Sequence, residues 1–192
     1  MSRKIFVIIA FAFSGIAPGL FAQDNVTPQR KHAIDSLALE KVKDLSKYIS
    51  IIGDKSTSFS EASRVIKRAN ELFATGSKMG VSTLASPAIN YFTVDNYFKR
   101  LMALNYIKVK VDWYSIHYIS DLEKQPDGKY VGVVTIYQRF EGYGPEGLKY
   151  TDVTKKDVTI YVEKKQTQIN GMPIDYWDVI LGDMKVTETK KN

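Results

Sequence analysis

Residues 158–186 read VTIYVEKKQTQINGMPIDYWDVILGDMKV and contain two alternating apolar segments on either side of Asn170-Gly171. Asn-Gly is the dipeptide favoured in two-residue hairpin turns, so we expect Ile169 to face Met172. This register brings apolar residues opposite one another farther along both strands: Val162 with Val179, and Ile160 with Leu181. Each strand then presents its apolar set on one face, as a half-buried sheet requires. The segment therefore predicts a long antiparallel hairpin with one buried face.

The opposite face of this hairpin places Glu163 against Asp178. Like charges directly across two strands destabilise a sheet. We predict that a bulge shifts this pair or that Lys164 and Lys165 compensate its charge. A cation site is the alternative, but two carboxylates alone are a weak signature of one.

The apolar alternation changes face midway along two of the predicted strands. The sequence passes from Val109, Val111 and Trp113 to Tyr114, Ile116 and Tyr118, and, across Gly182, from Trp177, Val179 and Leu181 to Met184 and Val186. Such a change indicates a β-bulge or burial of both faces, and bulges bend a sheet. Long bent strands with helices against one face enclose a hollow in which a small ligand can bind.

Three amphipathic helices precede the long strands. Each follows a residue that can cap a helix: Thr27 with Pro28 after it, Ser58 with Glu61 in capping-box spacing, and Thr93. Apolar residues at three- and four-residue spacing predict helices over 28–53, 59–76 and 94–104. Strands are expected over 79–84, 107–122, 129–142, 152–168 and 174–189, with a glycine-rich loop at 142–149.

The N-terminus has the pattern of a secretory signal peptide. Two basic residues precede an apolar run over 5–13, and small residues lead to a cleavage site between Ala22 and Gln23. A transmembrane anchor is the alternative, but the run is interrupted well before the roughly 20 apolar residues that a bilayer requires. We therefore divide the chain into a signal peptide, 1–22, and a single domain, 23–192, which is periplasmic or secreted.

The chain contains no cysteine, so it has no lipid-anchor cysteine, disulfide or thiolate metal site. Its 27 basic and 21 acidic residues become 25 and 21 once the two basic residues of the signal peptide are removed. The lysines are dispersed in pairs and do not gather on one helix, which argues against nucleic-acid binding. We expect no integral membrane span after signal cleavage.

Several classes of catalytic and cofactor site are missing from the sequence. It has neither a glycine-rich phosphate loop opening a helix nor a G-x-S-x-G nucleophile motif. The two histidines, His32 and His117, lie far apart, which disfavours a histidine-based zinc site. We therefore expect no metal and no cofactor.

The order of helix, helix, short strand, helix and four long strands resembles the NTF2-like superfamily, also called cystatin-like α+β. The segment YWDVILGDMKV, 176–186, resembles the closing strand of many such domains. The resemblance covers about 28–189 and implies an α+β fold in which three N-terminal helices pack on a strongly curved four- to five-stranded antiparallel sheet, the NTF2-like cone. It also implies a homodimer formed through the convex sheet face. It supplies no catalytic motif that can be transferred to this chain.

His117 is the strongest candidate for acid–base chemistry. A functional interpretation makes it a general base with Tyr114 or Tyr118 as hydrogen-bond donor. The orienting carboxylate would be Asp112, Asp121 or Asp178. The structural interpretation is a neutral imidazole that fills space in the sheet.

The partner of His117 depends on the preceding turn. If Asp127-Gly128 forms a two-residue turn, His117 faces Gln138 on an otherwise apolar face. A three-residue turn with a glycine bulge instead places His117 beside Tyr137. A polar pair on an apolar face is typical of a ligand pocket.

We therefore expect a non-catalytic binding protein that holds a small apolar or amphipathic ligand, or a protein partner, on its curved sheet. The residues expected to bind the ligand are Tyr114, His117, Tyr118, Gln138 and Trp177. Two alternatives stay open: a hydro-lyase or isomerase with His117 as general base, and an accessory subunit that contacts another protein of a cell-envelope assembly.

Overall fold

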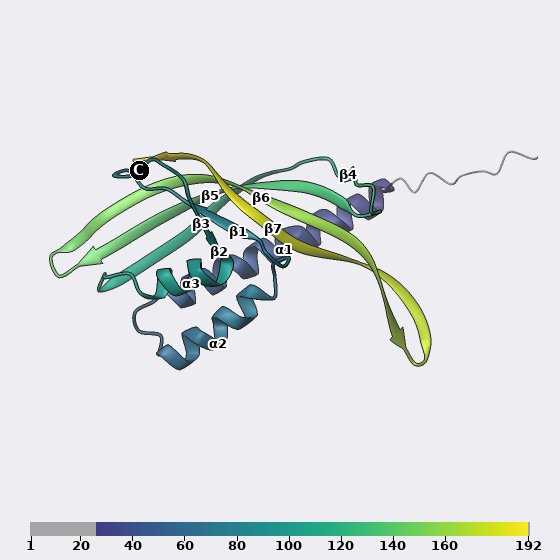
Figure 1. Cartoon of the computed structure of the whole chain (residues 1–192), viewed down its shortest axis with the longest axis horizontal. Helices are drawn as coiled ribbons and strands as arrows, with labels where there is room; N and C mark the ends of the chain where they lie inside the picture. Colours follow the sequence, from purple (N-terminus) through teal and green to yellow (C-terminus); the bar gives the residue numbers. More distant parts are fainter. Residues whose placement is uncertain (1–25, 192) are drawn as a thin grey trace, which may run out of the picture.

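The computed structural model describes residues 26–191, with the side chains of 116–119 excepted, as an α+β fold (Figure 1). Its helices are α1 (Pro28–Gly53), α2 (Phe59–Asn70) and α3 (Val94–Met102). Its strands are β1 (Lys78–Val81), β2 (Asn90–Thr93), β3 (Lys108–Ile119), β4 (Glu123–Lys124), β5 (Tyr130–Gly144), β6 (Gly147–Ile169) and β7 (Met172–Lys190).

The three helices begin where the sequence predicts. The hydroxyls of Thr27, Ser58 and Thr93 accept hydrogen bonds from backbone N–H groups three residues along the chain. Helix α2 ends at Asn70, earlier than predicted, because the next residues join the sheet. Leu181 N donates to Leu72 O at 2.8 Å, and Ala74 N donates to Leu181 O at 2.7 Å. Two hydrogen bonds to β7 thus replace the last predicted turn of the helix.

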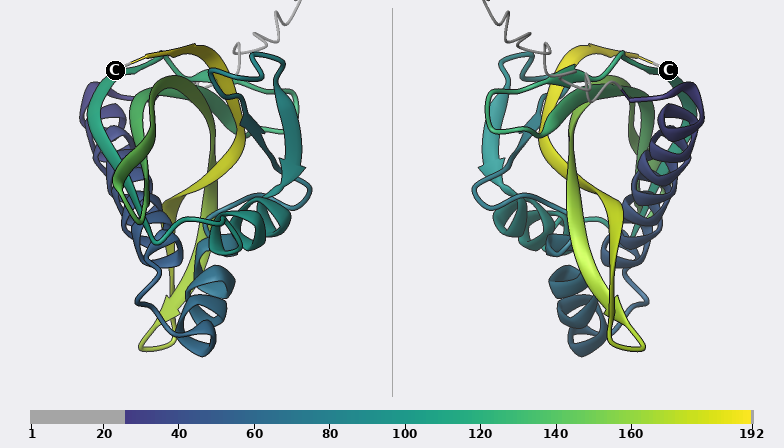
Figure 2. Two further views of the ribbon diagram at one scale, coloured as in Figure 1. Left: turned by 90° about the vertical axis from the view of Figure 1, so that its left-hand side faces the viewer. Right: turned by 90° about the vertical axis from the view of Figure 1, so that its right-hand side faces the viewer.

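The sheet is strongly curved (Figure 2), open and mixed, in the order β2-β1-β7-β6-β5-β3, with β4 paired to β5. The expectation of a four- to five-stranded antiparallel sheet is wrong in two respects: seven strands are present, and β1 pairs parallel to β7 through Met79 and Met184. Strands β2 and β4 are only four and two residues long. Segments this short contain too few alternations to be recognised.

The predicted register of the last hairpin is confirmed. Ile169 pairs with Met172, and the pairs Val162–Val179 and Ile160–Leu181 follow. Asn170 and Gly171 both have positive φ, 52° and 78°, as a type I′ turn requires. The bulge predicted after Gly182 is also present, since Val158 pairs with Met184 rather than with Asp183.

The acidic pair on the other face is compensated by one lysine. Glu163 lies opposite Asp178. Lys165 Nζ is 3.0 Å from Glu163 Oε1 and 2.7 Å from Asp178 Oδ2. Lys164, the other residue predicted to compensate this pair, instead bonds Asp175 at 2.7 Å. The ammonium group of Lys165 thus lies between the two carboxylates, where a bound cation was the alternative prediction.

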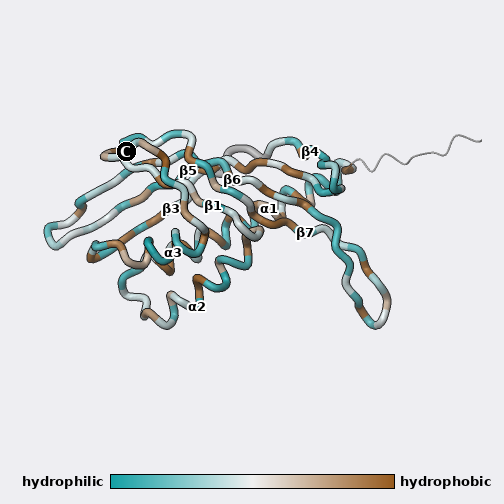
Figure 3. Tube along the Cα trace, in the orientation of Figure 1, coloured by the Kyte–Doolittle hydropathy of each residue, from teal (hydrophilic) through white to brown (hydrophobic). Residues whose placement is uncertain are grey.

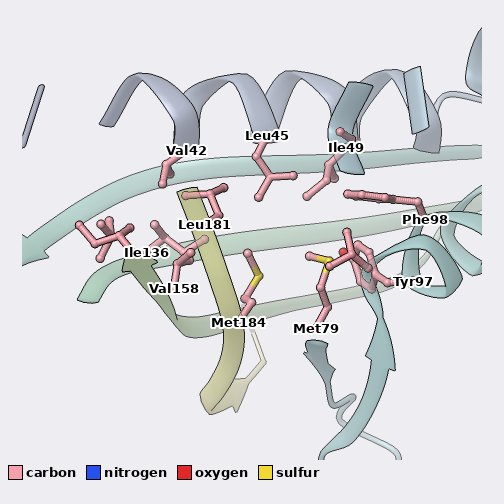
Figure 4. Close-up of a cluster of buried hydrophobic side chains, with 14 of the residues drawn as sticks. Val42, Leu45, Ile49, Met79, Tyr97, Phe98, Ile136, Val158, Leu181 and Met184 are labelled. Atoms are coloured by element: carbon pink, nitrogen blue, oxygen red, sulfur yellow. The ribbon is translucent and has the colours of Figure 1, made fainter. Parts of the chain in front are cut away.

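The core lies between the helices and the inner face of the sheet, the face that alternates into burial along β5 and β6. Val42, Leu45 and Ile49 of α1 point toward the strands (Figure 4). The strands contribute fully buried side chains to the same cluster, among them Ile136, Val158, Leu181 and Met184. At the other end of this cluster lie Phe98 and Tyr97 of α3 and Met79 of β1 (Figure 4).

The register of β3 against β5 differs from both predicted versions. Trp113, not His117, pairs with Gln138, and Ser115 pairs with Tyr137. Two register shifts occur, one at Tyr114 and one at His117. The first confirms the predicted parity change. The turn at Asp127-Gly128 is itself the three-residue version, since Gln125 N donates to Lys129 O and Gly128 has a φ of 84°. The pairing is already displaced at Ile119, which faces Val134, before either bulge is reached, and each bulge then adds one unpaired residue to β3.

Candidate functional site

A cavity of about 490 Å³ lies between the inner face of β5 and β6, helix α3 and the segment that joins β1 to β2. A volume of this size is within the range of small-molecule sites. The walls differ in chemistry: the sheet wall is polar, and the helix wall is apolar. The residues that line it include Phe92, Tyr97, Arg100, Leu101, Leu104, Tyr106, Gln138, Phe140, Tyr150, Asp152, Thr154 and Lys156.

The polar wall is a row of alternate residues on β6. Asp152, Thr154 and Lys156 share the inner face, and each is at most 4% exposed. Gln138 on β5 pairs directly with Thr154 and is 6% exposed. The same row continues into the apolar core as Val158. One face of one strand therefore carries both the floor of the cavity and part of the core.

The apolar wall comes from β2, α3 and the turn after α3. Tyr97 and Leu101 are buried on α3, and Leu104 is half-buried just beyond it. At the rim, the guanidinium of Arg100 lies 4.4 Å from the centre of the Phe92 ring. This wall offers aromatic and aliphatic surface to a ligand whose polar groups face the sheet.

Asp152 is held by a neighbouring tyrosine. Tyr150 Oη donates to Asp152 Oδ2 at 2.6 Å. Burial raises the pKa of Asp152, while the hydrogen bond from Tyr150, the charge of Lys156 and a hydrogen bond with Thr154 act in the opposite direction. Burial also raises the pKa of Tyr150 to about 12. Leu84 N donates to the same hydroxyl at 3.1 Å, which ties the β1–β2 connection to the sheet.

Lys156 has no comparable partner. It is 3% exposed, and its Nζ lies 5.7 Å from the centre of the Tyr97 ring. Within the described residues no carboxylate oxygen lies within 4.0 Å of this nitrogen, and no hydrogen bond reaches it. Burial lowers the pKa of Lys156 to about 8, and the charge of Asp152 opposes that shift.

Gln138 adds a second unsatisfied group. Its Oε1 is buried and has no hydrogen-bond partner in the described part of the chain. Trp113 pairs with Gln138 across β3 and β5, and its indole Nε1 is likewise buried without a hydrogen-bond partner in the described part of the chain. A buried polar atom without a partner costs free energy, so a molecule that supplies a donor for Gln138 would be favoured here.

The predicted ligand-binding residues are not gathered in one place. Gln138 lines the cavity. Tyr114 is 51% exposed and lies against Tyr137 and the guanidinium of Arg139. Trp177 packs edge-on against Tyr130, with ring centres 5.8 Å apart, and is not among the lining residues.

The side chains of His117 and Tyr118 lie outside the described residues. The general-base prediction for His117, and the ligand-binding prediction for both residues, therefore stay predictions. What the backbone does give is the position of His117 at a bulge of β3, away from direct pairing with Gln138.

Sequence reasoning missed Asp152, Thr154 and Lys156, although a usable signal existed. The hairpin register places Val158 and Ile160 on the buried face. Side chains alternate with a period of two along a strand, so the same face continues backward through Lys156, Thr154 and Asp152. Both faces of this stretch are equally polar, which hides the pattern when the stretch is considered alone.

Comparison of the chain with family models, with characterised proteins and with solved structures finds no match. Across 26–191, no helix is long and apolar enough to cross a membrane. The described side chains include no group of three or more His, Cys, Asp and Glu residues placed to hold a metal ion.

Proposed function

We propose that this protein binds a small amphipathic molecule in the cavity between α3 and the inner face of β5 and β6. The observation that carries the proposal is one polar wall opposite one apolar wall. Within the described residues, Lys156 is buried without an ion pair, and Gln138 Oε1 is buried without a hydrogen-bond partner. Ligand pockets typically combine an apolar surface with a few convergent polar groups.

The test is binding of N-phenyl-1-naphthylamine, a neutral fluorescent probe, to the purified domain. We expect saturable binding at one site per chain. Leu104→Trp places an indole on the apolar wall and narrows the cavity, so it should weaken binding by at least about tenfold, since the probe and the indole compete for the same surface. The matched control is Leu148→Trp, because Leu148 is 55% exposed and does not line the cavity.

Two results contradict this proposal. One is the absence of saturable probe binding. The other is equal binding by wild type and Leu104→Trp, which would place the probe elsewhere on the molecule. Circular dichroism of both tryptophan variants checks that each has folded.

A second candidate function is association through the tip of the β6–β7 hairpin, which projects beyond the helices (Figure 1) and carries several apolar residues (Figure 3). Four large side chains are exposed on one face of it: Ile169, Met172, Ile174 and Tyr176. We propose a second copy of the chain as the partner, in keeping with the homodimer that the NTF2-like resemblance implies. Native mass spectrometry should show a dimer that Met172→Lys dissociates; a monomeric wild type would rule the dimer out.

The NTF2-like assignment is itself a proposal. It is supported by the order of two helices, a short strand pair, a third helix and long antiparallel strands on a curved sheet. The periplasmic or secreted location is proposed from the signal-peptide pattern of 1–22, which lies outside the described residues. The intact mass of the protein recovered from cell-envelope and culture fractions tests it, because an uncleaved chain would contradict it.

A further inference from the structure

We propose that the ligand of this cavity is an amphipathic monocarboxylic acid whose carboxylate pairs with the ammonium group of Lys156 and whose hydroxyl or N–H group donates to Gln138. This inference rests on the proposed function, because it names the ligand class of the same cavity. Three observations lead to it: the isolation of Lys156, the charge of the polar wall and the relative positions of Lys156 and Gln138 on the sheet.

The isolation of Lys156 calls for an anion. Its side chain is 3% exposed, so water does little to stabilise the charge. The face of the Tyr97 ring lies 5.7 Å from its Nζ and contributes a cation–π contact. A buried ammonium without a counter-ion is costly, and a hydrogen-bonded carboxylate is the partner that offsets this cost best.

Asp152 does not fill that role within the protein. Its carboxylate already accepts from Tyr150 at 2.6 Å, and the described structure has no ion pair between Asp152 and Lys156. Asp152 lies four residues from Lys156 along an extended strand, which places their Cα atoms roughly 13 Å apart. A ligand carboxylate can therefore approach Lys156 without displacing an existing salt bridge.

The charge of the polar wall limits the ligand to one negative charge. Lys156 is the one cation among the four buried polar residues of this wall, and Asp152 carries the opposite charge. A phosphate dianion generally needs several donors or cations, which this wall does not provide. Arg100 at the rim is stacked on Phe92. A cationic head group would meet Lys156 itself.

Gln138 refines the class. It pairs with Thr154, so Lys156 is its diagonal neighbour on the same sheet face. Diagonal neighbours on one sheet face are about 7–8 Å apart, so the polar head of one ligand can contact both side chains. Lys156 supplies donors and Gln138 Oε1 needs one, so the head requires an acceptor and a donor together. A hydroxy acid or an N-acyl amino acid has this combination.

The experiment is isothermal titration of three probes that share one apolar body: 4-phenylbutanoate, 4-phenylbutan-1-ol and 4-phenylbutylamine. Near about pH 7, where Lys156 retains its proton, the acid should bind at least about tenfold more tightly than the alcohol, and the amine most weakly. Lys156→Met should weaken binding of the acid by at least about tenfold and change the affinity for the alcohol by no more than about twofold.

Lys155→Met is the matched control. Lys155 is adjacent in sequence, but it points to the opposite face of β6 and is only half-buried. This variant should preserve the preference for the acid. The contact with Gln138 is tested with 4-phenyl-2-hydroxybutanoate. It should bind more tightly than 4-phenylbutanoate, and Gln138→Leu should abolish this difference in affinity.

The outcomes separate the inference from the function on which it rests. Equal binding of acid and alcohol, or unchanged acid binding by Lys156→Met, overturns the monocarboxylate inference and leaves cavity binding intact. If none of the three probes nor N-phenyl-1-naphthylamine binds, both proposals fail. If Lys156→Met does not fold, the acid-to-alcohol affinity ratio of wild type is compared near about pH 7 and pH 10. A ratio that does not fall at the higher pH overturns the inference.

That last comparison takes account of the other groups that can titrate around the cavity. These are Asp152 and Tyr150 on β6, Tyr97 and Arg100 on α3, and Tyr106 after it. The tyrosines Tyr97 and Tyr150 both have pKa values raised by burial. Tyr106 lines the cavity as well, so the comparison is made in Tyr106→Phe; loss of the acid preference in that background is attributable to Lys156.

Discussion

At the scale of the residue, Lys155 and Lys156 show how position decides the role of a side chain. The two lysines are adjacent in sequence, but strand alternation sends one toward solvent and the other into the molecule. Lys156 keeps the ion-forming group of a surface residue although the side chain is only 3% exposed. Burying this charge lowers the stability of the unliganded protein. The size of that effect depends on pH and can be measured.

We predict that Lys156→Met stabilises the unliganded protein near about pH 7, by about 2–3 kcal/mol, because methionine removes a buried unpaired charge. The pKa of Lys156 is lowered from 10.5 to about 8 on folding. Between these values the unfolded chain binds more protons than the folded one, so wild-type stability rises with pH through this window. The advantage of the variant should shrink accordingly.

The measurement is urea unfolding of wild type and Lys156→Met at several pH values, with Lys155→Met as control. Below about pH 8 the difference between wild type and Lys156→Met should be constant, and near about pH 10.5 it should be smallest. A Lys156→Met protein that is less stable than wild type near about pH 7 would show that the ammonium is compensated in the folded state.

At the scale of the element, the sequence was sufficient where the signal is local. Thr27, Ser58 and Thr93 identify the helix starts because capping is a contact within four residues. Asn170-Gly171 identifies the hairpin register because the turn type follows from backbone φ. Strands β2 and β4 are too short to show an alternation, and the parallel pairing of β1 with β7 joins residues far apart in the sequence, which local patterns do not encode.

The same distinction explains the error at His117. The count of its partner starts from a turn ten residues away, and the pairing is already displaced at Ile119, before the bulge at His117 itself. The candidate site was therefore predictable only in part. Gln138 was found because it interrupts an apolar row, whereas Lys156 lies in a stretch where both faces are polar.

For the β6–β7 hairpin we predict that Lys165→Gln lowers stability by about 1 kcal/mol or less, since the site is partly exposed and solvent screens its charges. The substitution leaves Glu163 facing Asp178 with Lys129 as the remaining cation, 3.3 Å from Glu163. Lys164→Gln removes only the bond to Asp175 near the exposed tip and should have a smaller effect.

Thermal unfolding at low and high salt measures this difference between the two lysines. The loss in Lys165→Gln should diminish at about 1 M salt, because the Debye length is then only about 3 Å. If Lys164→Gln is as destabilising as Lys165→Gln, compensation of the Glu163–Asp178 pair is not the reason that Lys165 stabilises the hairpin.

At the scale of the whole molecule, the inner face of one sheet serves two purposes. Toward α1 it is covered by tightly packed aliphatic side chains, and toward α3 it leaves the cavity. The connection between β1 and β2 borders that cavity and is tied across it by a few polar contacts. Leu84 N bonds to Tyr150 Oη, and the hydroxyls of Ser82 and Thr189 lie 2.5 Å apart.

Access to the cavity should therefore depend on Tyr150. We predict that Tyr150→Phe speeds amide hydrogen exchange over 82–86 by about fivefold, because it removes a hydrogen bond worth about 1 kcal/mol. Amides of α1, which are buried against the apolar part of the sheet, should exchange at the wild-type rate. Bound N-phenyl-1-naphthylamine should dissociate faster from the variant.

Tyr143→Phe provides a closely matched control. Tyr143 Oη donates to Glu141 Oε2 at 2.7 Å, the same contact across two residues of a strand that Tyr150 makes with Asp152. Tyr143 does not line the cavity, so its loss should leave exchange over 82–86 unchanged. Equal exchange in wild type and Tyr150→Phe would mean that the β1–β2 connection is held by Ser82 and Thr189 instead. Faster exchange in Tyr150→Phe but not in Tyr143→Phe would show that the Tyr150 hydroxyl holds the β1–β2 connection against the sheet.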